Sequence, residues 1–104
     1  MPEQILELAK RLDNLRDQLD EIRAKTRSRK RKLELLRLRK KVSREIRRLI
    51  SINVRSNTQA YRNATAELKK ANRDMRKVIN DLQKYAEAIS TAAQAIDLVV
   101  KIAA

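Results

Sequence analysis

The chain has 104 residues and a formal net charge of +13, from 26 basic and 13 acidic side chains, and it contains neither cysteine nor histidine. These absences exclude disulfides and thiolate metal sites, and they remove the usual zinc ligands and the commonest general base. A glycine-rich phosphate loop is also excluded, because glycine is absent. We therefore expect a protein that is not an enzyme and has no cofactor or metal site.

The composition predicts the fold class. Proline occurs once, and the only aromatic residues are two tyrosines. Ala, Leu, Lys, Arg and Glu keep most of their rotamer freedom in a helix, whereas sheets favour β-branched and aromatic residues. We therefore predict an all-α protein with a single helical domain over residues 1–104.

The N-terminal segment has the spacing of an amphipathic helix. Pro2 and Glu3 suit a first helical turn, and apolar residues then recur at steps of three and four, at Ile5, Leu8, Leu12, Leu15, Leu19 and Ile22. Its acidic start is unlike a signal peptide. The most apolar stretch, residues 86–104, is interrupted by charges and is too polar to span a bilayer. A soluble, cytoplasmic protein is expected.

The net charge is concentrated in one quarter of the chain. Residues 23–48 hold fourteen basic and two acidic side chains, against three and six in residues 1–22 and nine and five in residues 49–104. Lys and Arg bind phosphates, so this segment predicts a surface for nucleic acid or another polyanion. The predicted phosphate-binding side chains are Arg23, Lys25, Arg27, Arg29, Lys30, Arg31, Lys32, Arg37, Arg39, Lys40, Lys41, Arg44, Arg47 and Arg48.

The basic segment is open to other interpretations. It could be a solvated helix face with some internal ion pairing, or a surface for an acidic protein partner. A membrane surface also attracts basic clusters, but the bulky aromatic anchors of interfacial helices are missing. Zinc fingers and aromatic stacking platforms are absent too, so binding of nucleic acid would have little sequence preference.

The apolar pattern changes phase inside the basic segment. Only Leu33 and Leu36 keep the phase of the N-terminal helix, while a second stripe faces roughly the opposite side of a straight helix, at Leu35, Leu38, Val42, Ile46 and Leu49. The pattern predicts a kink or break within residues 25–32, or a different neighbour for this segment.

A heptad seam runs from Val54 to Ala103 in steps of three and four. Past residue 78 its apolar stripe becomes wider than one partner helix can cover. We therefore predict a homodimer in which two antiparallel hairpins form a four-helix bundle. The predicted oligomer interface is Leu68, Met75, Val78, Leu82, Ile89, Ala92, Ile96 and Val99.

The chain is expected to reverse at about residues 52–56, where Ser56 and Gln59 fit a capping box. This gives coiled-coil-like arms over residues 3–51 and 57–102, each about 70 Å long. A single continuous rod is the alternative architecture, because the seams at the two ends of the chain share one heptad phase.

Two functions follow as hypotheses. The first is a self-associating helical protein that binds the nucleic-acid backbone through residues 23–48. The second is an assembly or adaptor protein that joins an acidic helical partner through its heptad and Ala-rich faces.

Overall fold

This computed structural model describes residues 3–52 and 59–102, and all the regular secondary structure in these residues is helical. The all-α prediction is therefore confirmed. None of the described helices is long and apolar enough to cross a membrane. The elements are α1 (Glu3–Lys25), α2 (Arg29–Ser51), α3 (Gln59–Asn80), the short 3₁₀ helix η1 (Leu82–Lys84) and α4 (Tyr85–Val100).

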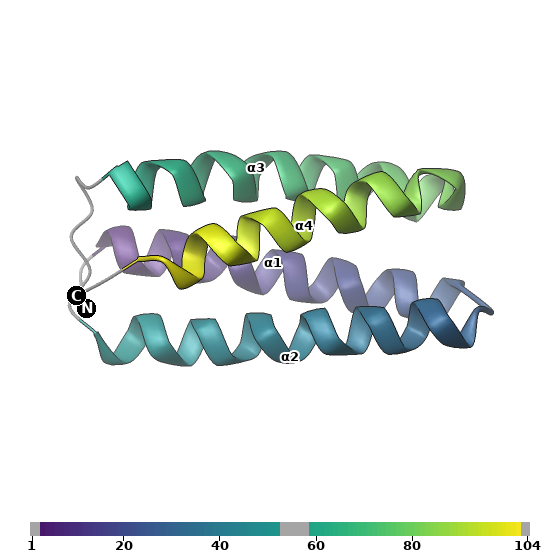
Figure 1. Ribbon diagram of the computed structural model, residues 1–104, viewed down its shortest axis with the longest axis horizontal. Helices are drawn as coiled ribbons and strands as arrows, with labels where there is room; N and C mark the ends of the chain where they lie inside the picture. The colour runs from purple at the N-terminus through teal and green to yellow at the C-terminus, as the bar shows by residue number, and fades with distance from the viewer. Residues whose placement is uncertain (1–2, 53–58, 103–104) are drawn as a thin grey trace.

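The four long helices form a bundle of two antiparallel hairpins, α1 with α2 and α3 with α4 (Figure 1). Helix α1 also packs against α3, and α4 packs less extensively against α2. Helices α2 and α3 therefore occupy opposite corners of the bundle, with α1 and α4 between them. The molecule measures 40 × 20 × 19 Å.

The first hairpin reverses within three residues that include no glycine. The Thr26 backbone N–H donates to the Ile22 carbonyl at the end of α1. The Ser28 hydroxyl then accepts a hydrogen bond from the Arg31 backbone N–H at 3.2 Å, which makes Ser28 the N-cap of α2. This break lies inside the predicted range 25–32.

The reversal resolves the phase change in the apolar pattern, because each helix turns its own stripe inward. Buried apolar side chains in α1 are Leu8, Leu12, Leu15, Leu19 and Ile22, and those in α2 are Leu35, Leu38, Val42 and Leu49.

The predicted continuous arm over residues 57–102 is corrected by a second break. Helix α3 ends one residue before Asp81, whose backbone is extended and whose carboxylate accepts a hydrogen bond from the Gln83 backbone N–H at 3.1 Å. Leu82 and Tyr85 keep the three-and-four spacing across the break. The apolar pattern therefore could not reveal it.

The two breaks shorten the molecule. Each predicted arm of about 70 Å is folded in half, and the longest dimension is 40 Å. All four helices of the bundle come from one chain, whereas the sequence predicted two helices from each of two copies. The homodimer stays a prediction. Apart from Ile52, the predicted turn at residues 52–56 lies outside the described residues, as does Ser56 of the capping box.

Candidate nucleic-acid interface

Helix α2 places its basic side chains away from the core. It carries eleven basic and two acidic residues, and four of its apolar side chains are buried against the other helices. Ten of the fourteen predicted phosphate-binding residues are exposed, at Lys25, Arg27, Arg29, Lys30, Lys32, Arg37, Lys40, Lys41, Arg44 and Arg47.

The other four predicted residues are partly buried, and three of them make contacts near the first hairpin. The Arg39 Nε donates to both carboxylate oxygens of Asp20, at 2.8 and 3.0 Å, which ties α2 to α1. Arg23 lies 3.8 Å from the same carboxylate. The Arg31 guanidinium lies 4.5 Å from the centre of the Tyr85 ring, in a cation–π contact.

The fourth, Arg48, connects the end of α2 to the end of α4. Its guanidinium donates to the carbonyl oxygens of Val99 and Ile102, each at 2.8 Å. It also donates to the Glu45 carboxylate at 2.6 Å, and Glu45 is only 6% exposed. Arg48 therefore compensates a buried charge and binds the last carbonyls of a helix, so its role is structural.

None of the ten exposed basic side chains has a carboxylate within ion-pair distance among the described residues. Lys25 is set apart because its ammonium donates to the Ile79 carbonyl at 3.0 Å. The other nine, which we call the α2 basic face, are Arg27, Arg29, Lys30, Lys32, Arg37, Lys40, Lys41, Arg44 and Arg47.

The first turn of α2 has four consecutive basic residues, 29–32, and no acidic residue. Positive charge at the positive end of a helix dipole is unfavourable by about 0.3–1 kcal/mol per charge. Helix stability therefore does not explain this placement, whereas a bound anion would relieve it.

A shallow hollow runs beside α2, lined by Glu34, Arg37, Leu38, Lys40, Lys41 and Arg44. Glu34 is its only acidic side chain, and its carboxylate accepts a hydrogen bond from the Tyr85 hydroxyl at 2.7 Å. Burial raises the pKa of Tyr85 above 10, and the hydrogen bond to Glu34 and that residue's charge raise it further. The Tyr85 hydroxyl therefore stays protonated and donates to the Glu34 carboxylate. The neighbouring basic side chains are not paired with Glu34 and face solvent.

The predicted oligomer-interface residues lie inside one chain. Leu68, Met75, Val78, Ala92, Ile96 and Val99 are buried, and Leu82 and Ile89 are partly buried. Their partners in the described core include side chains of α1 and α2.

Sequence reasoning assigned no binding residue to α3, although this helix exposes six basic side chains. The signal was present in the sequence as a helical repeat, since Arg62, Lys69 and Arg76 recur every seven residues. The six, which we call the α3 basic face, are Arg62, Lys69, Lys70, Arg73, Arg76 and Lys77.

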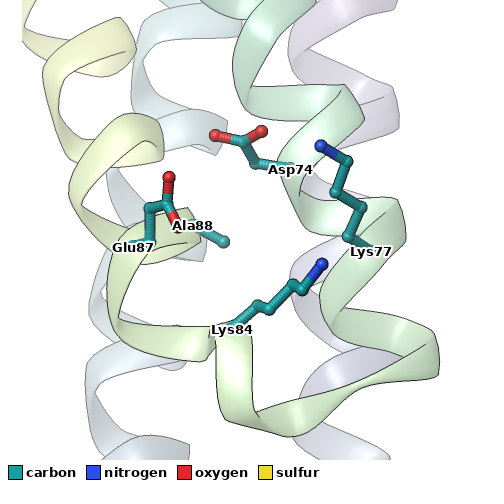
Figure 2. Close-up of a pocket in the computed structure, with 5 residues that line it drawn as sticks. All are labelled: Asp74, Lys77, Lys84, Glu87 and Ala88. Atoms are coloured by element: carbon teal, nitrogen blue, oxygen red, sulfur yellow. The ribbon is translucent and has the colours of Figure 1, made fainter.

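A small hollow between α3 and α4 is a poorer candidate site. Figure 2 shows the ammonium groups of Lys77 and Lys84 and the carboxylates of Asp74 and Glu87 around it, beside Ala88. Its volume of about 70 Å³ holds only a few water molecules, and its charges balance. Among the described residues no group of His, Cys, Asp or Glu is placed to hold a metal ion.

Comparison of the chain with protein-family models, with curated proteins and with solved structures found no match.

Proposed function

We propose that the protein is non-enzymatic and binds nucleic acid through the phosphate backbone, using the α2 basic face. The observation that carries this proposal is the row of nine exposed basic side chains without ion-pair partners among the described residues. A solvated helix face with internal pairing accounts for Arg23, Arg39 and Arg48, whose charges meet carboxylates, but it does not account for these nine.

The length of the face suits a polymer better than a small anion. From Arg29 to Arg47 the helix rises by about 27 Å, and basic side chains recur along the whole of it. A single phosphate would engage two or three of them and leave the rest unpaired. A polyanion with regularly spaced charges engages many at once and gains from the counterions it releases.

The chemistry of the face favours backbone contacts over base reading. The α2 basic face contains only Lys and Arg, with neither an aromatic side chain for stacking nor an Asn or Gln for pairing with adenine. Binding should therefore be steeply salt-dependent and nearly independent of sequence.

The proposed binding needs only one copy of the protein. The seam residues that would join a dimer, or an acidic helical partner in the adaptor hypothesis, are mostly buried by the chain's own helices. Light scattering of the protein as it elutes from a size-exclusion column distinguishes a monomer of 12.1 kDa from a dimer of twice that mass. This measurement tests self-association separately from binding.

The test is a salt titration of binding to a random-sequence duplex and to a single strand, with heparin as a competitor. If about five side chains of the face contact phosphates, the log–log slope on a duplex is about −4.5, and affinity falls about 500-fold between about 50 and 200 mM salt. The variant Arg37→Gln/Lys41→Gln/Arg44→Gln should reduce the slope to about −1.8 and the fall to about 12-fold.

A charge-matched control separates the local surface from net charge. Lys10→Gln/Lys84→Gln/Lys101→Gln removes the same three charges from exposed positions outside α2. It should keep most of the wild-type slope. Equal loss in both variants, or no binding at about 50 mM salt, would contradict the proposal and direct the search to an acidic protein partner.

A further inference from the structure

We infer that the α3 basic face and the groove between α3 and α1 form a second binding surface for nucleic acid, so that one molecule bridges two duplexes. This inference rests on the proposed function of the α2 basic face. It adds a second site on the opposite corner of the bundle.

The α3 basic face resembles the α2 basic face in its lack of counterions. Among the described residues, none of its six basic side chains lies within ion-pair distance of a carboxylate. The two acidic residues of α3 leave most of it uncompensated, and only Lys77 shares a hollow with one of them, Asp74. Asp74 accepts a hydrogen bond from the Thr91 hydroxyl of α4 at 3.1 Å, and Glu67 has a buried carboxylate oxygen. Both acids are partly buried, so the exposed face of α3 keeps its positive charge.

The groove between α1 and α3 extends this face. No carboxylate lines it, and the lining residues are Arg11, Asn14, Ala66, Lys69, Asn72, Arg73 and Arg76. Arg11 is paired with Glu7 of its own helix at 2.9 Å, whereas Lys69, Arg73 and Arg76 have no ion-pair partner among the described residues. The groove therefore concentrates positive potential from these three side chains.

The floor of the groove is polar. Asn72, which is 5% exposed, donates from its amide nitrogen to the Arg11 carbonyl at 3.3 Å. The Asn72 amide oxygen and the Arg11 Nε are buried, and neither has a hydrogen-bond partner. These two atoms are already shielded from solvent, so the exposed charges of Lys69, Arg73 and Arg76 decide what the groove can bind. An apolar helix docked here would bury these charges without partners, which is costly, whereas a sugar–phosphate backbone supplies anionic oxygen atoms for them. The groove therefore suits nucleic acid better than a protein helix.

The two basic faces point in opposite directions. Figure 1 shows α3 along the upper edge of the bundle and α2 along the lower edge. Between them, α1 presents exposed Asp17 and Glu21, and α4 presents exposed Glu87 and Asp97. Exposed carboxylates therefore interrupt the positive surface between the two faces.

The size of the bundle prevents one duplex from occupying both faces. Its cross-section is 20 × 19 Å, and a duplex with a persistence length of about 50 nm does not wrap an object of this width without a large bending cost. Two duplexes held on opposite sides are separated by more than the Debye length of about 8 Å at physiological salt, so their mutual repulsion is screened. Bridging is therefore the arrangement that uses both faces.

The test is capture of a second duplex. An immobilised duplex is incubated with protein and then with a labelled duplex, and the retained label is measured together with the affinity for a single duplex in solution. The wild-type protein should retain the label. Lys69→Gln/Arg73→Gln/Arg76→Gln should reduce retention at least about tenfold, as expected for losing three phosphate contacts, while single-duplex binding through α2 persists. The charge-matched variant Lys10→Gln/Lys84→Gln/Lys101→Gln should retain the label.

The outcomes separate the inference from the proposed function. If the wild-type protein binds one duplex but never captures a second, the inference is wrong and the proposed function stands. If the α3 variant captures as well as wild type, the second site is not on α3, and a dimer joined through another surface is indicated. If the wild-type protein binds no duplex at all, both fail. Circular dichroism of each variant checks that the fold is retained.

Discussion

Arg47 and Arg48 are adjacent in the sequence, yet the structure gives them opposite roles, which makes a sharp prediction. Arg47 is exposed and belongs to the α2 basic face. Arg48 instead donates hydrogen bonds to the buried Glu45 carboxylate and to the backbone carbonyls of Val99 and Ile102 at the end of α4. Replacement of Arg48 by Gln leaves Glu45 without its cation, but Arg47→Gln removes no described contact. The first change should therefore act on stability and the second on binding.

The size of the Arg48 effect follows from its surroundings. Removing one partner of a fully buried ion pair costs about 3–5 kcal/mol. The Glu45 side chain is 8% exposed and that of Arg48 is 31% exposed, so solvent screening reduces the loss, and we expect Arg48→Gln to lower the free energy of unfolding by about 2–3 kcal/mol. For a domain of this length that corresponds to a fall in Tm of about 10–20 °C.

The assay is urea denaturation followed by far-ultraviolet circular dichroism, with duplex binding measured on the same samples. Arg47→Gln should change stability by less than about 0.5 kcal/mol and weaken binding. Glu45→Gln/Arg48→Gln should recover part of the loss, because a neutral amide at position 45 needs no cation. If Arg48→Gln were as stable as wild type, or Arg47→Gln were equally destabilising, the division of the basic residues into structural and exposed groups would be refuted.

Two further predictions concern the hairpin at α4. Tyr85→Phe removes the hydroxyl that donates to Glu34 and should cost about 1 kcal/mol in unfolding experiments. Folding raises the pKa of Tyr85 above the unfolded value of 10.0, so the stability that the Tyr85 hydroxyl contributes is complete below pH 10 and is lost as the pH rises further. Tyr85→Phe should therefore flatten that part of the curve of unfolding free energy against pH. An unchanged curve would contradict this assignment. Asn80→Ala/Asp81→Ala should favour a continuous helix across the break between α3 and α4. Small-angle scattering should then give a radius of gyration above the Cα value of 13.4 Å. An unchanged radius would mean that packing alone fixes the reversal.

The apolar stripes of the long helices could be predicted from the sequence because they depend on local spacing. The steps from Leu8 to Ile22 and from Leu35 to Leu49 identify buried side chains regardless of which helix covers them. The first break was also detectable, since the two stripes conflict in phase on a straight helix. The second was not, because a seam that continues in phase through Leu82 reads the same in a straight helix and in one that reverses.

The sequence by itself determined that the chain is helical and that its charge is concentrated around α2, because propensity and composition belong to single residues and their near neighbours. Only the tertiary structure decided which basic side chains are available. Arg39 is paired because α1 brings Asp20 beside it, and Arg48 is held because α4 ends next to it. It also decided that α2 and α3 lie on opposite corners, since charge spacing along a helix carries no information about which neighbour each face meets.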